Sequence, residues 1–98
     1  MKYNYKLTFM YDGGRYQGWQ KQQGRLTIEG TMESVLEKIL GVSPIKLIAS
    51  GRTDAGVHAL GQVANFHVPS SFFLSHTLEE LQQQCNARLP EDIRILSV

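Results

Sequence analysis

Cysteine is scarce in this sequence, and its scarcity excludes several classes of small domain. Cys85 is the single cysteine among 98 residues. One thiol cannot close an internal disulfide, and no cysteines and histidines have the spacing of zinc ligands. We interpret Cys85 as a small buried apolar residue on a helix. The fold must therefore rest on a hydrophobic core.

Long apolar runs are missing as well. No stretch approaches the roughly 20 apolar residues that a membrane-spanning helix requires. Residues 1–6 lack the apolar core of a signal peptide. We expect a cytoplasmic protein with no membrane association. At 98 residues the chain forms one domain at most, and a core of that size has little stability to spare.

Strong net charge is also absent, but the charge is unevenly distributed. The net charge is +1 overall. Residues 1–28 carry five basic residues against Asp12 alone, whereas residues 29–98 carry five basic residues against eight acidic ones. Such asymmetry produces a basic face on some proteins, although it is commonly just solvated surface.

Two hydrophobic periods alternate along the chain. An alternation of aromatic and polar residues indicates a strand, whereas apolar residues three and four apart indicate a helix. Thr27 or Thr31 would cap the first helix and Gly41 would end it, while Thr77 and Glu80 form a capping box for the second. The expected elements are strands over 3–11, 45–50, 62–68 and 93–98, and helices over 28–40 and 78–89.

This order of elements predicts the fold class. Strand, helix, strand, strand, helix, strand is the split βαβ, or ferredoxin-like, pattern of the α+β class. Right-handed crossovers place both helices on one face of a four-stranded antiparallel sheet. We expect residues 45–68 to form a hairpin. The expected buried residues are Leu7, Phe9, Met32, Val35, Leu36, Ile39, Ala64, Phe66, Leu78 and Leu81.

The link between the second and third strands is long and chemically rich. A hairpin needs about two to five linking residues, whereas this link takes about eleven, with three glycines, Arg52, Asp54 and His58. Loops set on a rigid sheet are where function concentrates. Arg52 and Asp54 point the same way in an extended stretch. They form either an ordinary salt bridge, which composition alone favours, or a catalytic pair.

Three segments carry a specific resemblance. They are residues 11–22 (YDGGRYQGWQKQ), residues 50–66 (SGRTDAGVHALGQVANF) and residues 86–93 (NARLPEDI). Together they resemble the tRNA pseudouridine synthases of the A type, and the second segment is the most specific. Gly14 departs from the family pattern, where threonine is common, and so does 28–30, where Val-Gln-Gly is common. Neither departure touches the second segment.

The resemblance implies a function. Residues 1–98 would be the N-terminal catalytic domain of a longer, two-half enzyme that converts uridine to pseudouridine in the anticodon stem-loop of tRNA, at family positions 38, 39 and 40. Homodimerisation of the full-length protein is implied too. Because the chain stops at Val98, inside an apolar strand, we expect a fragment with little activity of its own.

By the same resemblance, Asp54 is the catalytic carboxylate. It either attacks the anomeric carbon of the sugar or takes a proton from the sugar, and the sequence leaves both routes open. Arg52 would fill the space left by the extruded base, contact phosphate and orient Asp54. Isomerisation needs no redox step, so no cofactor or metal is expected.

Further residues are candidates for contact with RNA. They share a place in or beside the first two segments: Arg15, Tyr16, Trp19, Lys21, Arg25 and His58. Tyr16 and Trp19 either stack on RNA bases or cover the edge of the sheet, with equal weight. Lys21 and Arg25 are candidate phosphate contacts. The position of His58 beyond Asp54 also suits a structural role.

Two other functions compete with this interpretation. The first is a non-catalytic RNA-binding module, since four-stranded sheets of this shape bind single-stranded RNA through aromatic residues on the open face. The open face expected here carries no aromatic residue on the first and third strands, which counts against it. The second is a dimerisation domain without a ligand, in which the glycine-rich loop bearing Arg52 and Asp54 would have no purpose.

Overall fold

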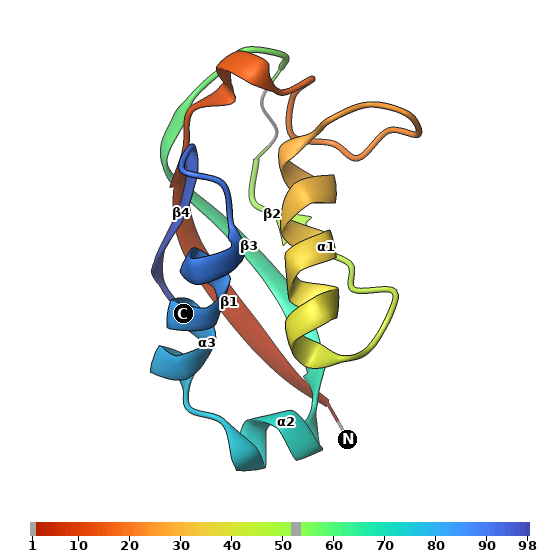
Figure 1. The fold of residues 1–98 in the computed structure, drawn as a ribbon, viewed down its shortest axis with the longest axis vertical. Helices are drawn as coiled ribbons and strands as arrows, with labels where there is room; N and C mark the ends of the chain where they lie inside the picture. Colours follow the sequence, from red (N-terminus) through yellow and green to blue (C-terminus); the bar gives the residue numbers. More distant parts are fainter. Residues whose placement is uncertain (1, 52–53) are drawn as a thin grey trace.

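The computed structural model describes residues 2–51 and 54–98. Its centre is a four-stranded antiparallel sheet in the order β2-β3-β1-β4 (Figure 1). The strands are β1 (Lys2–Tyr11), β2 (Ile48–Ala49), β3 (Ala59–Pro69) and β4 (Ile93–Ser97). The helices α1 (Ile28–Leu40) and α3 (Leu78–Arg88) lie on one face of this sheet. The ferredoxin-like arrangement predicted from the sequence is confirmed.

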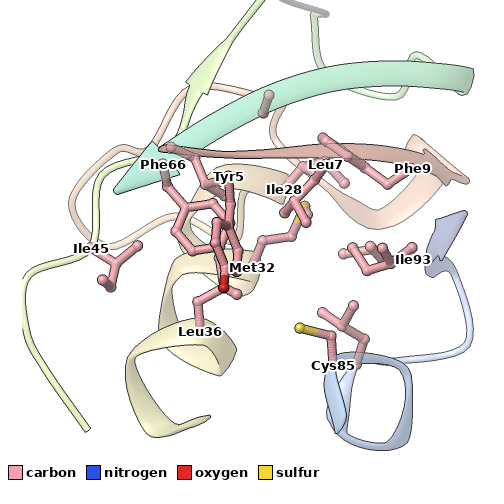
Figure 2. Packing of buried hydrophobic residues seen from close by; sticks show 14 of the residues in the cluster. Tyr5, Leu7, Phe9, Ile28, Met32, Leu36, Ile45, Phe66, Cys85 and Ile93 are labelled. Atoms are coloured by element: carbon pink, nitrogen blue, oxygen red, sulfur yellow. The ribbon is translucent and has the colours of Figure 1, made fainter. Parts of the chain in front are cut away.

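Helix α1 forms where its end signals and its apolar stripe predict it. The Thr27 side chain accepts a hydrogen bond from the Gly30 amide at 3.2 Å, and Gly41 ends the helix in the left-handed region at φ 71°. Ile28, Met32 and Leu36 recur every four residues and are buried. Figure 2 shows these side chains pointing from α1 toward the sheet.

The core lies between the sheet and the two helices. Figure 2 shows Leu7 and Phe9 from β1, and Cys85 from α3, meeting in this layer. Most residues expected to be buried are buried, and Val35 and Ile39 pack against the core while remaining partly exposed. Within the described residues, no helix is both long and apolar enough to cross a bilayer.

Helix α3 begins with the predicted capping box. The Thr77 hydroxyl accepts from the Glu80 amide at 3.0 Å, and the Glu80 carboxylate accepts from the Thr77 amide at 3.4 Å. The expected burial of Leu78 is wrong, since 42% of this residue is exposed. Strand β4 pairs with β1 only from Thr8 to Tyr11, and Leu78 borders the hollow left beyond it. Its side chain therefore has less of the sheet to pack on.

The second strand is shorter than predicted. The sequence indicates a strand over 45–50, but β2 contains Ile48 and Ala49 alone. The amide of Ile45 donates to Glu37 at 2.8 Å and that of Leu47 donates to Glu33 at 2.9 Å, both on α1. These donors are therefore not available to a strand ladder. The expected hairpin remains, because β2 pairs antiparallel with β3.

The sequence did not predict helix α2 (Ser70–Ser75). This helix follows directly from β3, with Pro69 as its N-cap residue and no side chain capping it. Phe72 is buried, and its ring stacks on that of His76 with centroids 4.1 Å apart. Six residues are too few to show a helical period, which is why the pattern gave no signal.

Candidate functional site: the loops at one end of the sheet

The candidate site is built at the end of β1 and the start of β3. After Tyr11, the chain enters a 3₁₀ turn, η1 (Gly13–Arg15). Its N-cap residue, Asp12, accepts a hydrogen bond of 2.9 Å from the Gly14 amide. The pairing of β1 with β3 shifts register in this region, between Phe9 and Tyr11. Such irregularities bend a strand and redirect the residues beside it. Both loops therefore leave the sheet in defined directions.

Gly13 packs directly on the loop that follows Asp54. Its amide donates to Nδ1 of His58 at 2.9 Å, and the Gly56 amide donates to the carbonyl of Tyr16 at 3.2 Å. A Cβ atom on Gly13 would lie 1.9 Å from the carbonyl oxygen of Val57. A side chain has no room there, so glycine is required for this close approach.

Asp54 opens a turn on the exposed side of this contact. The Val57 amide donates to its carbonyl oxygen at 3.2 Å, and Gly56 completes the turn at φ 79°, where glycine is favoured. Asp54 itself is exposed, so an external molecule can reach it. Arg52 lies outside the described residues, and its expected pairing with Asp54 is not tested.

His58 joins the two loops. Its Nδ1 atom lies 2.9 Å from the Gly13 amide nitrogen and 3.0 Å from Oδ1 of Asp12. Accepting from Gly13 requires an unprotonated Nδ1, whereas an ion pair with Asp12 requires a protonated one. Nδ1 therefore makes one of these two interactions at a time. His58 joins the two loops in either case, and its expected contact with RNA is not tested by this structure.

The third segment of the resemblance also reaches this end of the molecule. Asp92 accepts hydrogen bonds from Nε of Arg15 at 2.5 Å and from the Tyr16 hydroxyl at 2.8 Å, and its carbonyl accepts from the Asp12 amide at 2.8 Å. The Arg15 hydrogen bond holds the pKa of Asp92 below its usual value. Burial, and then the bond to Asp92, raises the pKa of Tyr16 to about 12. Arg15 thus braces the η1 turn.

The aromatic candidates lie in the core. Tyr16 and Trp19 are 2% and 3% exposed, and the Trp19 ring lies 5.7 Å from that of Phe9. Both side chains cover the sheet in this structure, and their expected stacking on RNA is not tested by it. Their rings are enclosed and do not face solvent.

Lys21 and Arg25 lie on the exposed loop before α1. The Lys21 amide donates to Glu29 at 2.9 Å, and its Nζ lies 3.6 Å from Glu33. Arg25 donates to the Gln17 side chain at 3.4 Å, a neutral partner. The loop is therefore anchored by its backbone and exposes both cationic side chains.

Glu29 and Glu33 were missed by the sequence reasoning. Both are almost fully buried, at 1% and 2% exposure. Burial, and then a hydrogen bond with Glu29, raises the pKa of Glu33 to about 7. Burial alone would raise the pKa of Glu29, but hydrogen bonds from Glu33 and Lys46 lower it. The signal was a row of glutamates every four residues, at 29, 33 and 37, beside the apolar stripe of α1.

The described ranges contain neither a metal site nor a reactive cysteine. No three histidine, cysteine, aspartate or glutamate residues among them are placed to hold a metal ion. Burial raises the pKa of the Cys85 thiol to about 12, so this side chain stays protonated and unreactive. The expected small buried cysteine on a helix is confirmed.

Comparison with known proteins identifies the family of this chain. The sequence model of a family described as tRNA pseudouridine synthase matches residues 7–98. The tRNA pseudouridine synthase A of Bacillus sp. (strain KSM-64) is 50% identical over 96 residues, which are 97% of this chain and 37% of that protein. That of Thermodesulfovibrio yellowstonii is 46% identical over 95 residues, which are 97% of this chain and 35% of that protein.

The chain thus spans about a third of the length of these relatives, and it matches their N-terminal part. The three segments that carry the resemblance, separated by up to about eighty residues of sequence, meet through Gly13, His58 and Asp92. Family match and geometry agree, and this chain belongs to the tRNA pseudouridine synthase family.

Proposed function

We propose that the protein to which this chain belongs isomerises uridine to pseudouridine in the anticodon stem-loop of tRNA, with Asp54 as its catalytic carboxylate. The observation that carries this proposal is the exposed Asp54 turn, held from beneath by Gly13 and Tyr16 within a family match that covers residues 7–98. A rigid support under an accessible carboxylate is what a reaction controlled by positioning needs.

The reaction balances without any added reagent. In one route the Asp54 carboxylate forms a bond to the anomeric carbon, and the bond from that carbon to the uracil nitrogen breaks with its electron pair on the base. The freed uracil turns, its C5 attacks the same carbon, and the carboxylate leaves; C5 then loses its proton to solvent while N1 takes one up. In the other route the carboxylate first takes a proton from the sugar, and the base departs to leave a glycal. C5 then bonds to the anomeric carbon, the proton returns to the sugar, and C5 and N1 exchange protons with solvent in the same way.

Either route requires the target uridine to leave its stack, at a cost of a few kcal/mol. We assign to Arg52 the space that the base vacates and a contact to phosphate. The aromatic residue that stacks on the extruded uracil would come from the part of the protein beyond this chain. The isolated 98 residues should therefore have little activity, and a fragment that turned over like the whole protein would contradict this division of the site.

The test is Asp54→Asn in the full-length protein, assayed by tritium release from C5-labelled, unmodified tRNA. The amide keeps the size of the side chain but neither attacks carbon nor accepts the proton, so turnover should vanish. Affinity for tRNA should remain near that of the wild type, because it comes from many phosphate contacts. Glu79→Gln, an exposed carboxylate on α3, is the matched control and should behave as the wild type.

Arg52→Lys separates a catalytic role from a salt bridge. Lysine keeps the charge but loses the planar fork of donors. Turnover should fall strongly and tRNA affinity only modestly. Substantial turnover by Asp54→Asn would refute the assignment of the carboxylate. A wild-type protein that binds tRNA without releasing tritium would favour the non-catalytic RNA-binding module.

The same proposal includes the oligomeric state of the enzyme and its cellular location. A homodimer of the full-length protein, acting on tRNA in the cytoplasm, is what membership of this family suggests. Light scattering of the purified full-length protein tests the dimer, and a monomeric mass at working concentration would refute it.

A further inference from the structure

A groove outside the Asp54 site lies on the helix side of the sheet. This open groove has a volume of about 480 Å³ and lies between the exposed loop that precedes α1, the first turns of α1 and the end of α3. Lys21, Arg25 and Arg88 line it, together with uncharged residues such as Gln22 and Ser34. The groove therefore combines cations from two segments that are far apart in the sequence.

The charged residues that line the groove are all cations, and they lie among uncharged residues that include Leu26, Val35 and Pro90. None of the described residues that line it carries a carboxylate. Lys21 is partly neutralised by the buried Glu33, 3.6 Å away, whereas the hydrogen-bond partner of Arg25 among the described residues is the neutral Gln17. Arg88 is exposed in the last turn of α3. Three cations without an acid among them attract an extended anion.

The groove and the Asp54 turn lie at the same end of the molecule. Figure 1 shows the loop before α1, coloured orange, and the η1 turn together at this end. Four residues of chain separate Tyr16, whose carbonyl accepts from Gly56, from Lys21 on the rim of the groove. The Gln17 amide also donates to the Leu26 carbonyl at 2.7 Å, which fixes the base of this loop. A macromolecule bound at Asp54 can thus continue across this end.

We propose that this groove holds the phosphate backbone of the substrate RNA, next to the nucleotide that enters the Asp54 site, with Arg88 as a phosphate contact. This inference rests on the function proposed above and extends it to a second surface. The groove is open, has no aromatic lining among the described residues, and presents charge rather than buried donors. Such a surface contacts phosphates and does not read bases.

The experiment measures tRNA affinity of the full-length protein at several salt concentrations, together with turnover at saturating tRNA. The variants are Arg25→Gln and Arg88→Gln, and Lys38→Gln, an exposed cation in the last turn of α1, is the control. Each lost phosphate contact should make the slope of the logarithm of the association constant against the logarithm of salt concentration less negative by about 0.7–0.9. Near 0.1 M salt, this change corresponds to about a sixfold loss of tRNA affinity. Lys38→Gln should match the wild type in affinity, salt slope and turnover.

Several results would overturn the inference. An unchanged salt slope in Arg25→Gln and Arg88→Gln would do so, and so would a loss of affinity without a change in slope. Arg88→Lys guards against a mere loss of folding, since it keeps the charge and should restore the slope. Polyglutamate that competes as well as an RNA hairpin of equal charge would assign the groove to acidic protein. The Asp54→Asn result is independent of all these outcomes, so a failure of the groove leaves the proposed reaction intact.

Discussion

Replacing Gly13 by alanine adds one methyl group at the contact that supports the Asp54 turn. The new carbon would lie 1.9 Å from the Val57 carbonyl oxygen and 2.7 Å from its carbonyl carbon, and both are backbone atoms that cannot rotate away. Real Cβ contacts are essentially never shorter than 3.0 Å, so the two loops must separate by more than 1 Å. A misplacement of about 1 Å costs roughly a hundredfold in turnover.

The stability cost should be of similar size to the catalytic cost, because a hundredfold fall in turnover corresponds to about 2.7 kcal/mol. Overpacking of this kind destabilises a protein by about 1–3 kcal/mol. Gly14→Ala is the matched control one residue along, because its Cβ would meet only the Asp12 side chain, at 3.1 Å, and that side chain can move. Tritium release at saturating tRNA, tRNA affinity and melting temperature should be measured on both variants. The reasoning would be refuted by a Gly13→Ala protein that turns over within about twofold of the wild type.

Two further predictions concern titrating groups. Folding favours the protonated form of Glu33, so the stability that this group contributes is complete below pH 4.5 and is lost as pH rises through about 7. Glu33→Gln should abolish that loss and raise the free energy of unfolding above pH 7 by on the order of 1–3 kcal/mol relative to the wild type. Denaturation of both proteins from pH 5 to 8 tests this, and an equal loss of stability in the two would contradict it. Asp92 behaves in the opposite sense, because Arg15 lowers its pKa and the stability that Asp92 contributes is lost on acidification. The melting temperature of Asp92→Asn should therefore fall less steeply with decreasing pH than that of the wild type. An equal fall in both proteins would argue against a stabilising Arg15–Asp92 pair.

Much of the fold could be predicted because local and global signals agree. Helix α1 has an apolar stripe, a threonine cap and a glycine end, and the structure uses all of them. The capping box of Thr77 and Glu80 is equally local. Each of these features is decided within a few residues, so the sequence pattern contains the answer.

The failures arise where a distant partner decides. Whether 45–50 pairs as a strand depends on Glu37 and Glu33, which lie on a helix eight and fourteen residues before the amides that they bind. The exposure of Leu78 depends on how far β4 follows β1. The burial of Tyr16 depends on Asp92, which lies 76 positions away in the sequence and accepts a hydrogen bond from the Tyr16 hydroxyl. A periodic pattern holds no information about such contacts.

The glutamates of α1 supply hydrogen-bond acceptors that a neighbouring strand would otherwise provide. Carboxylates, in place of main-chain carbonyls, accept the amide hydrogens of Ile45 and Leu47. Those two amides are therefore protected by side chains, and any opening of α1 exposes them to solvent while the sheet remains closed. The hydrogen-exchange rates of these two amides, which lie beside the sheet, should therefore measure how often helix α1 opens.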